Sequence, residues 1–537
     1  MKRILCAVLC AAAILAAGCS GQDGKKHPKK ERSTAETESA ADSGSTAYDI
    51  SGGMPVISIE TVSRADDVMK FVTEPVAAHV SKQIASWTRG YVMPPAPYYE
   101  ACTVSVTAPD GTELLAPADA DVKVRGNWTT SYDKKPLRLK FGQKQNLLGL
   151  NGGAEFKNWV LLAGAKDISL SRDKAAFQLA KALYAEDGFY AADAQFAEVK
   201  INGEYWGVYL LTEQQEAKKN RVNISTPKQD ETDIYTGYFL EFDGYYYAED
   251  PMQQFKMDYA GNAPLKPFDG AGGGGRTVKV QQESYRPGRK KPVGITIRND
   301  IRSQAQHDFI AEYIGNVYRV LYSAAYEHKA YQFSGDLRSI SKTDAITPRE
   351  AVERVVNVRS LADAYILAEI ACDADLYWSS FFMDVDFSEK GSRLLTFEAP
   401  WDYDSAFGNK DRCADGTGFY AANIIPDVNG EYETINPWLA VLMYEDWFQE
   451  IIREQWTKLY DSGAFERTAE MILSDAENGK EAFSRNISRW GKPADDGGIR
   501  NELTSATRRL RTQSEGAEQL AAWIRTRAEF LNAYWHK

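Results

Sequence analysis

Aspartates whose spacing could support phosphoryl transfer gather in the segment 373–409. Asp375 follows a helical apolar pattern, Ser380 lies five positions beyond it, and Asp402 and Asp404 come after a predicted β-hairpin. Phosphoryl transfer needs one carboxylate to accept the proton of the attacking hydroxyl, and further oxygen ligands to hold a divalent metal against the phosphates. The residues of this segment therefore predict a carboxylate site that binds a divalent metal.

The predicted hairpin consists of a strand at 383–387, a turn, and a second strand at 393–397. Protein kinases place a base and an amide ligand in a loop, then a hairpin, and then a metal-binding Asp. In that order Asp375 occupies the position of the base and Ser380 that of the neutral ligand. Because Asp is also common where it caps a helix or closes a turn, each aspartate taken alone has a structural interpretation as well.

The elements in the first half of the chain are predicted to be mainly strands. Apolar residues alternate with basic ones at 122–125 and again at 137–141, as they do in a half-buried strand. The dipeptide Asn202-Gly203 separates two β-prone runs and suits a two-residue hairpin turn with positive φ at both positions. Between these strands, helical spacing of apolar residues predicts a helix at 173–183.

The elements in the second half are predicted to be mainly helices. Apolar residues recur at helical spacing over 309–321 and again over 520–534. Ser360 with Asp363 predicts a capping box that opens a helix ending near Ile370. A strand-rich first half followed by a helix-rich second half indicates an α+β fold.

The chain begins with the pattern of an export signal. Basic residues precede a short apolar run that ends in Ala17-Gly18-Cys19. This run is shorter than the ~20 apolar residues of a membrane span, so residues 1–18 are predicted to be a signal peptide. A Cys directly after Ala-Gly is typical of the bacterial lipobox, although an incidental Cys is the alternative. We therefore expect a lipid on Cys19, a membrane anchor on the extracytoplasmic side, and a polar tether over 19–53.

Charge and residue usage exclude several classes of protein. The net charge of −12 provides no positive field for general nucleic-acid binding. The 5 His residues are placed too far apart for a His-based metal hydrolase, and their small number also disfavours a Ser-His triad. Beyond the signal and Cys19, the cysteines Cys102, Cys372 and Cys413 have no spacing of a disulfide framework or a zinc site, although one pair could form a bridge outside the cell.

Several short motifs follow one another along the chain. They are Arg125-Gly126-Asn127-Trp128, the strand Lys134–Phe141, Trp159–Leu162 followed by Asp167 and Arg172, the hairpin Asn202–Tyr209 ending at Glu213, and Pro400-Trp401-Asp402-Tyr403-Asp404 through Gly408. In type and order these motifs resemble those of the CotH family, a group of atypical protein kinases first known from spore coats. The resemblance covers roughly residues 54 to 410, and the closing helix also fits it.

The resemblance implies a divergent protein-kinase-like fold with two lobes. The strand-rich N-lobe would span about 54–300 and the helix-rich C-lobe about 301–537, together forming the domain 54–537. Such a protein would bind ATP with Mg²⁺ or Mn²⁺ and would phosphorylate Ser or Thr hydroxyls of other proteins. Together with the export signal, this implies a kinase that acts on envelope or surface proteins.

The resemblance also assigns roles to residues at the matching positions. Asp375 would be the catalytic base, and Asp402 and Asp404 would be the metal ligands. Ser380 stands where the family usually has Asn, with Ser379 as a competing alignment. A serine would supply a shorter neutral oxygen, so metal binding would be weaker or would be completed by a water.

The resemblance further implies which residues would bind the nucleotide. Arg125, Lys135 and Lys140 would neutralise its phosphates, and the sequence does not decide which lysine is the main one. Lys140 could equally be an ordinary exposed strand lysine, and Arg125 beside Gly126 could equally belong to an ordinary turn. Glu213 would lie near the nucleotide at the junction of the lobes.

Two other functions stay open beside the kinase. Ser380 and the extracytoplasmic address suit a CotH-like module that has lost catalysis and serves as an adhesin or envelope scaffold, whereas the intact aspartates favour catalysis. Paired carboxylates among Tyr and Trp would suit a carbohydrate-active enzyme, but the order of the motifs argues against it. Thermal stabilisation by nucleotide would separate the kinase from the other two.

Overall fold

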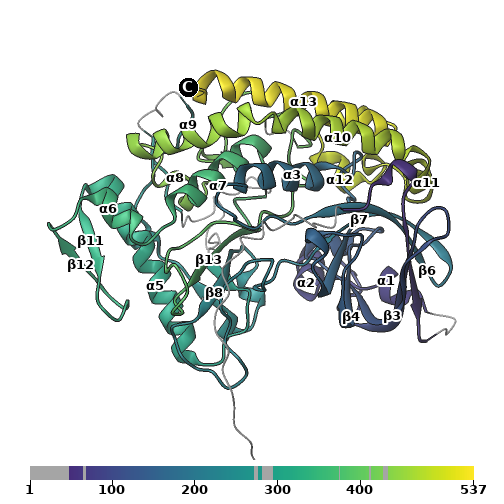
Figure 1. Ribbon diagram of the computed structural model, residues 1–537, viewed down its shortest axis with the longest axis horizontal. Coiled ribbons are helices and arrows are strands. Elements are labelled where there is room, and N and C mark those ends of the chain that lie inside the picture. The colour runs from purple at the N-terminus through teal and green to yellow at the C-terminus, as the bar shows by residue number, and fades with distance from the viewer. Residues whose placement is uncertain are drawn as a thin grey trace, which may run out of the picture. The chain divides into compact units, whose positions relative to one another are not determined.

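Strands of the first half close into a β-barrel in the computed structural model of the protein, which describes residues 47–63, 68–270, 276–280, 294–373, 375–410, 413–426 and 433–537 (Figure 1). In barrel order the strands are β1 (Val56–Thr61), β2 (Glu100–Thr107), β3 (Glu113–Val124), β4 (Leu137–Gln145), β5 (Phe156–Leu162), β7 (Glu204–Glu213) and β6 (Ala194–Ile201). Neighbouring strands pair antiparallel, except that β1 and β6 run parallel where the barrel closes. The first-half strands thus form one continuous surface.

Period-two alternation decides which side chains fill the barrel. Val122 pairs with Leu139 across β3 and β4, and both are fully buried in the apolar core of the barrel. Lys123 pairs with Arg138, and this pair faces outward because successive side chains of a strand point to opposite faces. The core inside the barrel is separate from the larger apolar core under the helices.

A second sheet lies beside the barrel and carries part of the pocket described below. Its strands, in order, are β13 (Phe381–Asp386), β8 (Gly237–Phe242), β10 (Gly294–Ile297) and β9 (Gln254–Lys256). Every residue of β8 is buried, since β8 is an inner strand of the sheet and both of its faces are covered. Two shorter pairings complete the described strands, β11 (Ala330–Phe333) with β12 (Ile340–Thr343) and β14 (Ile425–Pro426) with β15 (Glu433–Thr434).

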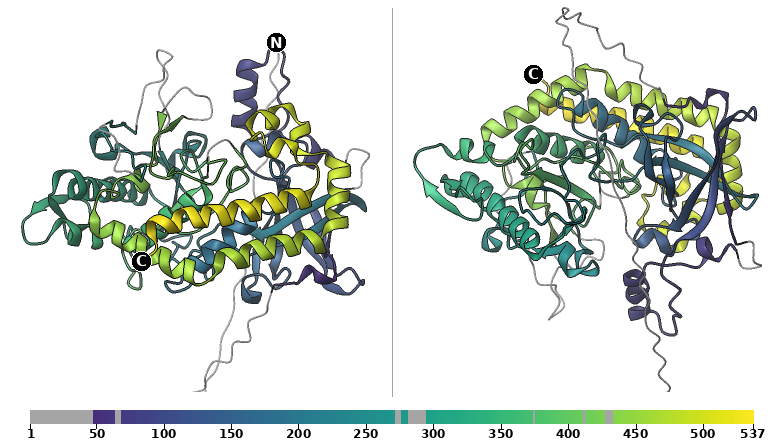
Figure 2. Two further views of the ribbon diagram at one scale, coloured as in Figure 1. Left: turned by 90° about the horizontal axis from the view of Figure 1, so that it is seen from above. Right: turned by 60° about the horizontal axis from the view of Figure 1, so that its bottom comes forward.

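The C-terminal helices cover one side of the barrel and of the second sheet, and other helices flank them (Figure 1). The longer ones are α2 (Ala78–Trp87), α3 (Arg172–Tyr184), α5 (Gln304–Tyr322), α7 (Val358–Ala371), α9 (Asp446–Asp461), α10 (Ala464–Asn478), α11 (Lys480–Trp490) and α13 (Gln513–Trp535). Shorter ones are α1 (Lys70–Thr73), α4 (Tyr259–Asn262), α6 (Pro348–Glu353), α8 (Pro437–Ala440) and α12 (Gly497–Glu502). The closing helix α13 packs along α10 and α9 above α3 and α7 (Figures 1 and 2).

The structure confirms the mixture of strands and helices that the sequence predicts. The hairpin between β6 and β7 turns at Asn202 and Gly203, which have φ of 51° and 80°. The predicted helices at 173–183, 309–321 and 520–534 are α3, α5 and α13. The sequence did not predict that the first-half strands close into a barrel, and the two kinase-like lobes stay a prediction.

The predicted start of α7 is wrong. The N-cap is Asn357, whose side chain accepts a hydrogen bond from the Ser360 backbone N–H at 3.3 Å. Ser360 lies inside the helix, where its hydroxyl donates to the Asn357 carbonyl oxygen and accepts from the Phe397 backbone N–H. Asp363 is fully buried and accepts a hydrogen bond from Gln455, so it caps nothing.

The predicted hairpin at 383–397 forms only in part. Its first strand is β13, which pairs with β8, and the return segment meets β13 in a single bridge between Asp384 and Thr396. The neighbouring Leu395 bridges instead to Val356, because this segment passes toward the start of α7.

The anchor predicted at Cys19, the signal peptide and most of the tether lie outside the described residues. No helix among those that the structure describes has the length and apolar character needed to cross a membrane. The cysteines Cys102, Cys372 and Cys413 are buried and free, so none of them forms a disulfide.

Candidate functional site

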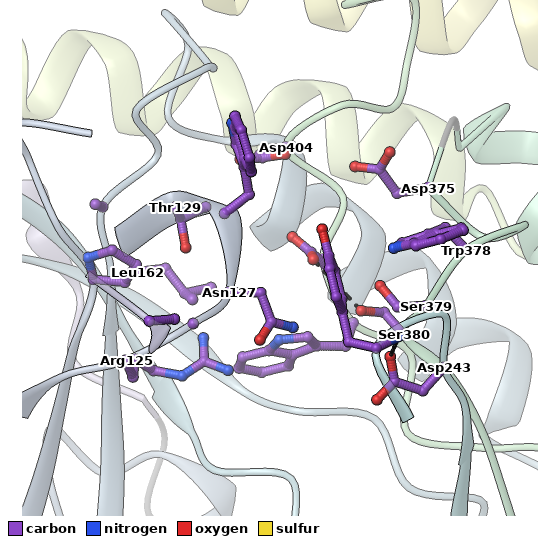
Figure 3. Close-up of a pocket in the computed structure, with 18 of the residues that line it drawn as sticks. Arg125, Asn127, Thr129, Leu162, Asp243, Asp375, Trp378, Ser379, Ser380 and Asp404 are labelled. Atoms are coloured by element: carbon purple, nitrogen blue, oxygen red, sulfur yellow. Dashed lines mark hydrogen bonds between the residues drawn. The ribbon is translucent and has the colours of Figure 1, made fainter. Parts of the chain in front are cut away.

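A pocket of about 1020 Å³ lies between the barrel and the second sheet. One wall comes from the barrel side, with Arg125, Asn127 and Leu162, and the other comes from the segment 375–382 and the end of β8. Figure 3 shows Arg125 facing Asp243 and Ser380 across the pocket, with Asp404 and Asp375 at a different level. The pocket therefore collects side chains from segments that are far apart in the sequence.

The loop that carries Asp402 and Asp404 is held by buried hydrogen bonds. The Arg172 Nε donates to the Ala406 carbonyl oxygen at 3.0 Å, and the Asn409 amide donates to the Asp404 carbonyl oxygen at 2.7 Å. Asp402 has a φ of 71°, a left-handed conformation that is costly for a residue with a Cβ. Because the surrounding bonds fix the loop, this conformation persists and directs both aspartates to the pocket.

The loop after α7 carries Asp375 and Ser380. The helix ends at Ala371, and its C-cap Cys372 has a left-handed φ of 48°, which turns the chain toward the pocket. The Ser380 backbone N–H donates to Glu241 of β8 at 2.9 Å, and its hydroxyl donates to an Asp402 carboxylate oxygen at 3.4 Å. The Lys410 Nζ lies 3.5 Å from an Asp375 carboxylate oxygen. These contacts join the two loops, so Asp375, Ser380, Asp402 and Asp404 all line one pocket.

Crowded carboxylates dominate the electrostatics of the pocket. Burial, together with the charges of Asp404 and Asp375, raises the pKa of Asp402 to about 7, although the cations Lys166 and Arg125 oppose this shift. Burial also raises the pKa of Asp404, and Lys166 is the main group that opposes this shift. Buried carboxylates that repel one another favour a bound cation, since a cation restores the charged form of each.

Cations stand next to these carboxylates. Burial would lower the pKa of Lys166, but the charges around it, Asp404 foremost, raise its pKa well above the ordinary value. Burial lowers the pKa of Arg125 to about 10, and its guanidinium lies 5.3 Å from the ring of Trp401 and close to the Asp402 charge. Both cations line the pocket and are placed to meet an anionic ligand there.

Three of the residues expected at the nucleotide lie outside the pocket lining. The Lys135 ammonium is buried and donates to the Thr130 carbonyl oxygen. Lys140 is exposed on the outer face of the barrel. Glu213 is fully buried, accepts a hydrogen bond from the Asp193 backbone N–H at 2.9 Å, and pairs with Arg221 at 3.4 Å. The structure brings only Arg125 of that set to the pocket.

Sequence reasoning missed several pocket residues. Lys166 directly precedes Asp167 of a motif, and Asp173 directly follows Arg172, so proximity to those motifs was the available signal. The Tyr403 backbone N–H donates to Asp173 at 2.7 Å, which ties the start of α3 to the Asp402 loop. No sequence motif marked Glu241 as a pocket residue, and it lies in the strand β8, every residue of which is buried.

The oxygen donors of the pocket suit a hard divalent cation in their chemistry. Carboxylates and a hydroxyl are the ligands that Mg²⁺ and Mn²⁺ take, and Mg²⁺ keeps several waters or phosphate oxygens rather than filling an all-protein cage. Within the described ranges, no group of three or more His, Cys, Asp or Glu side chains is close enough to hold a metal by itself. Asp402, Asp404 and the Ser380 hydroxyl are thus oxygen donors of the kind that such a cation takes.

Comparison with known proteins gives one family. The family model described as CotH kinase protein matches residues 122–531. The matched range includes both loops of the pocket and the barrel wall that carries Arg125. No curated protein matches the chain.

Proposed function

We propose that this chain, which belongs to the CotH kinase protein family, is an ATP- and metal-dependent protein kinase with a divergent two-lobed kinase-like fold. It transfers phosphate to Ser or Thr hydroxyls of envelope or surface proteins. Its predicted signal and lipidated Cys19 hold it on the extracytoplasmic side of a membrane. The chemistry is that of an atypical phosphotransferase.

The observation that carries this proposal is the meeting of two distant loops in one pocket. Asp375 follows α7, whereas Asp402 and Asp404 follow the second sheet, and the Ser380 hydroxyl joins the loops through its hydrogen bond to Asp402 at 3.4 Å. Phosphoryl transfer depends mainly on positioning and charge stabilisation. The pocket supplies both carboxylates and cations for this purpose.

Each pocket residue has a role that follows from its chemistry. Asp375 accepts the proton of the substrate hydroxyl, and a lysine beside it keeps its carboxylate in place, with Lys410 Nζ at 3.5 Å. Lys166 and Arg125 balance the negative charge of the phosphates. When bound, Mg²⁺ or Mn²⁺ neutralises charge on the phosphates, and Asp402, Asp404 and the Ser380 hydroxyl are the residues that would hold it.

Ser380 in the position of the usual Asn changes the balance of this site. Its hydroxyl already donates to Asp402, and its backbone N–H is held by Glu241. A Ser oxygen reaches less far than an Asn oxygen, so a water is expected to complete the contact with the metal. Ser380→Asn is therefore expected to strengthen metal-dependent activity.

Labelled ATP tests the proposal. The full chain is incubated with Mg²⁺ or Mn²⁺ and a Ser-rich protein, beside Asp375→Asn and Asp402→Asn. Both variants should lose phosphate transfer by about 10²-fold or more, and only Asp402→Asn should also lose thermal stabilisation by nucleotide. Glu466→Gln is the control, since Glu466 is a surface residue paired with Arg525. Equal transfer by the parent and Asp402→Asn would refute the proposal.

A second candidate function is a binding module without catalysis. Ser380 in place of the usual Asn favours it, because a shorter oxygen ligand gives a weaker metal site. In that case the parent would show no phosphate transfer and no stabilisation by nucleotide with either metal.

A further inference from the structure

A row of cations runs from the pocket along the outer face of the barrel. It consists of Arg125, Lys123, Arg138 and Lys140, and we name it the basic row. Lys123 pairs with Arg138 across β3 and β4, and Lys140 pairs with Asp121 one step further out. Arg125, Lys123 and Arg138 line the pocket, whereas Lys140 is exposed beyond its rim. The row thus connects the pocket with the surface.

The charges of the basic row are only partly balanced by the protein. Like charges directly opposite each other on neighbouring strands are destabilising, and Lys123 and Arg138 are such a pair. Burial lowers the pKa of Lys123, and the charges of Arg138, Arg125 and Lys140 lower it further. The acidic neighbours include Glu216 at 3.6 Å from Arg138, Asp121 opposite Lys140, and Asp402 and Glu241 near Arg125. An anionic ligand would relieve the remaining repulsion.

An exposed aromatic ring organises the outer part of the row. Tyr99 is 38% exposed, and its ring centroid lies 4.8 Å from the Lys123 Nζ and 5.6 Å from the Lys140 Nζ. Cation–π contacts of this kind hold the ammonium groups in place. Tyr98 beside it is 42% exposed, and Pro97 lines the pocket. Apolar surface therefore accompanies the charges, as it does where a polypeptide binds.

The row is longer than the phosphates of one nucleotide require. Strand residues two positions apart are separated by about 7 Å, so the level of Lys140 lies ~13 Å along the strand from Arg125. The proposed function places the nucleotide phosphates beside Arg125 and Asp402, at the inner end. Lys140, together with the Lys123–Arg138 pair, then remains available to another anionic group.

We infer that the basic row binds acidic side chains of the protein substrate next to the hydroxyl that is phosphorylated. The inference rests on the proposed function and names its substrate class. Because an extended peptide rises about 3.3 Å per residue, cations at successive levels of the row match acidic residues at alternate positions of the substrate. Arg125 and Lys123, the inner part of the row, lie in the lining of the pocket, where a flat lipid surface does not reach them.

Matched Ser peptides test this inference. They carry Glu, Gln or Lys at alternate positions beside one Ser, and the full chain is assayed as the parent, as Lys123→Glu, as Lys140→Glu and as the double variant. The parent should have a KM about tenfold lower for the Glu peptide than for the Gln peptide, and the double variant should lose this ratio. Lys200→Glu is the control, because Lys200 is exposed on β6 at another part of the barrel. It should keep the parent ratio.

The other outcomes are distinguishable. A lower KM for the Lys peptide, or an unchanged Glu-to-Gln ratio in the double variant, overturns the inference. If the variants instead raise the KM for ATP alone, the row binds nucleotide and the inference is wrong. If no peptide is phosphorylated, the proposed function fails, and fluorescence anisotropy of the labelled Glu peptide still decides the inference: binding that is lost in the double variant supports it, and no binding overturns it. Binding to phosphatidylserine vesicles without binding to the Glu peptide also overturns it.

Discussion

Replacing Arg172 by Met tests whether a buried ion pair holds the loop of Asp402 and Asp404. The side chains of Arg172 and Asp167 are 1% and 3% exposed, and the guanidinium bonds both the Asp167 carboxylate and, at 3.0 Å, the Ala406 carbonyl oxygen. Removing one partner of a buried pair costs about 3–5 kcal/mol, because the other charge stays buried without compensation. In Arg172→Met, Asp167 keeps hydrogen bonds from the backbone N–H groups of residues 169 and 172, so we expect the lower end, ~3 kcal/mol.

Urea unfolding followed by Trp fluorescence measures this loss of stability. Arg525→Met is the matched control, since the Arg525 and Glu466 side chains are 39% and 54% exposed and such a surface pair contributes at most about 1 kcal/mol. Arg172→Met should also reduce stabilisation by nucleotide, because the Asp402 loop loses its bond at Ala406. A loss below about 1 kcal/mol, equal to that of the control, would refute the reasoning about this pair.

Two further predictions concern a buried acid and a glycine of the pocket. Burial raises the pKa of Asp363 to about 8, so the folded chain keeps a proton there that the unfolded chain loses from pH ~4 upward. This group by itself therefore contributes a fall of about 1.4 kcal/mol per pH unit in the free energy of unfolding, up to pH ~8. Asp363→Asn should remove this contribution and so make the fall less steep than in the parent, and an unchanged slope in urea titrations across that range would contradict it. Gly126 has a φ of +100°, and a Cβ there would lie 2.4 Å from the Thr129 hydroxyl, so Gly126→Ala should lower the melting temperature and weaken nucleotide binding. Gly111→Ala, with a φ of +88° and open space, isolates the backbone strain, and an equal effect on nucleotide binding would show that the clash is unimportant.

Local patterns predicted the elements whose signals are contained in a short stretch of sequence. The Asn202-Gly203 turn needs positive φ at both residues, and this requirement is visible in the dipeptide itself. The apolar spacing from Leu520 to Leu531 similarly matches the buried face of α13, whereas Tyr534 at the end of the pattern is 54% exposed. Barrel closure was not predictable in this way, because the parallel pairing of β1 with β6 joins segments that are more than a hundred residues apart.

The site was predictable only where side-chain chemistry and order were both informative. Asp375, Asp402 and Asp404 stood out as carboxylates around a hairpin, and the structure places all three in one pocket. The sequence could not show that Lys166 lines the pocket whereas Lys135 and Lys140 do not. That difference depends on how the folded backbone directs each side chain. Lys135 turns inward to a carbonyl oxygen, and Lys140 points out from the barrel.

Metal-dependent binding of a non-hydrolysable ATP analogue tests the central claim that the two loops form one nucleotide and metal site. Calorimetry would compare the parent, Asp402→Asn and Glu466→Gln with and without Mn²⁺. Mn²⁺ should tighten binding to the parent and to Glu466→Gln, and Asp402→Asn should have a Kd at least about tenfold higher, a loss of ~1.4 kcal/mol. Binding that is independent of Mn²⁺, or an equal Kd in the parent and Asp402→Asn, would contradict the claim.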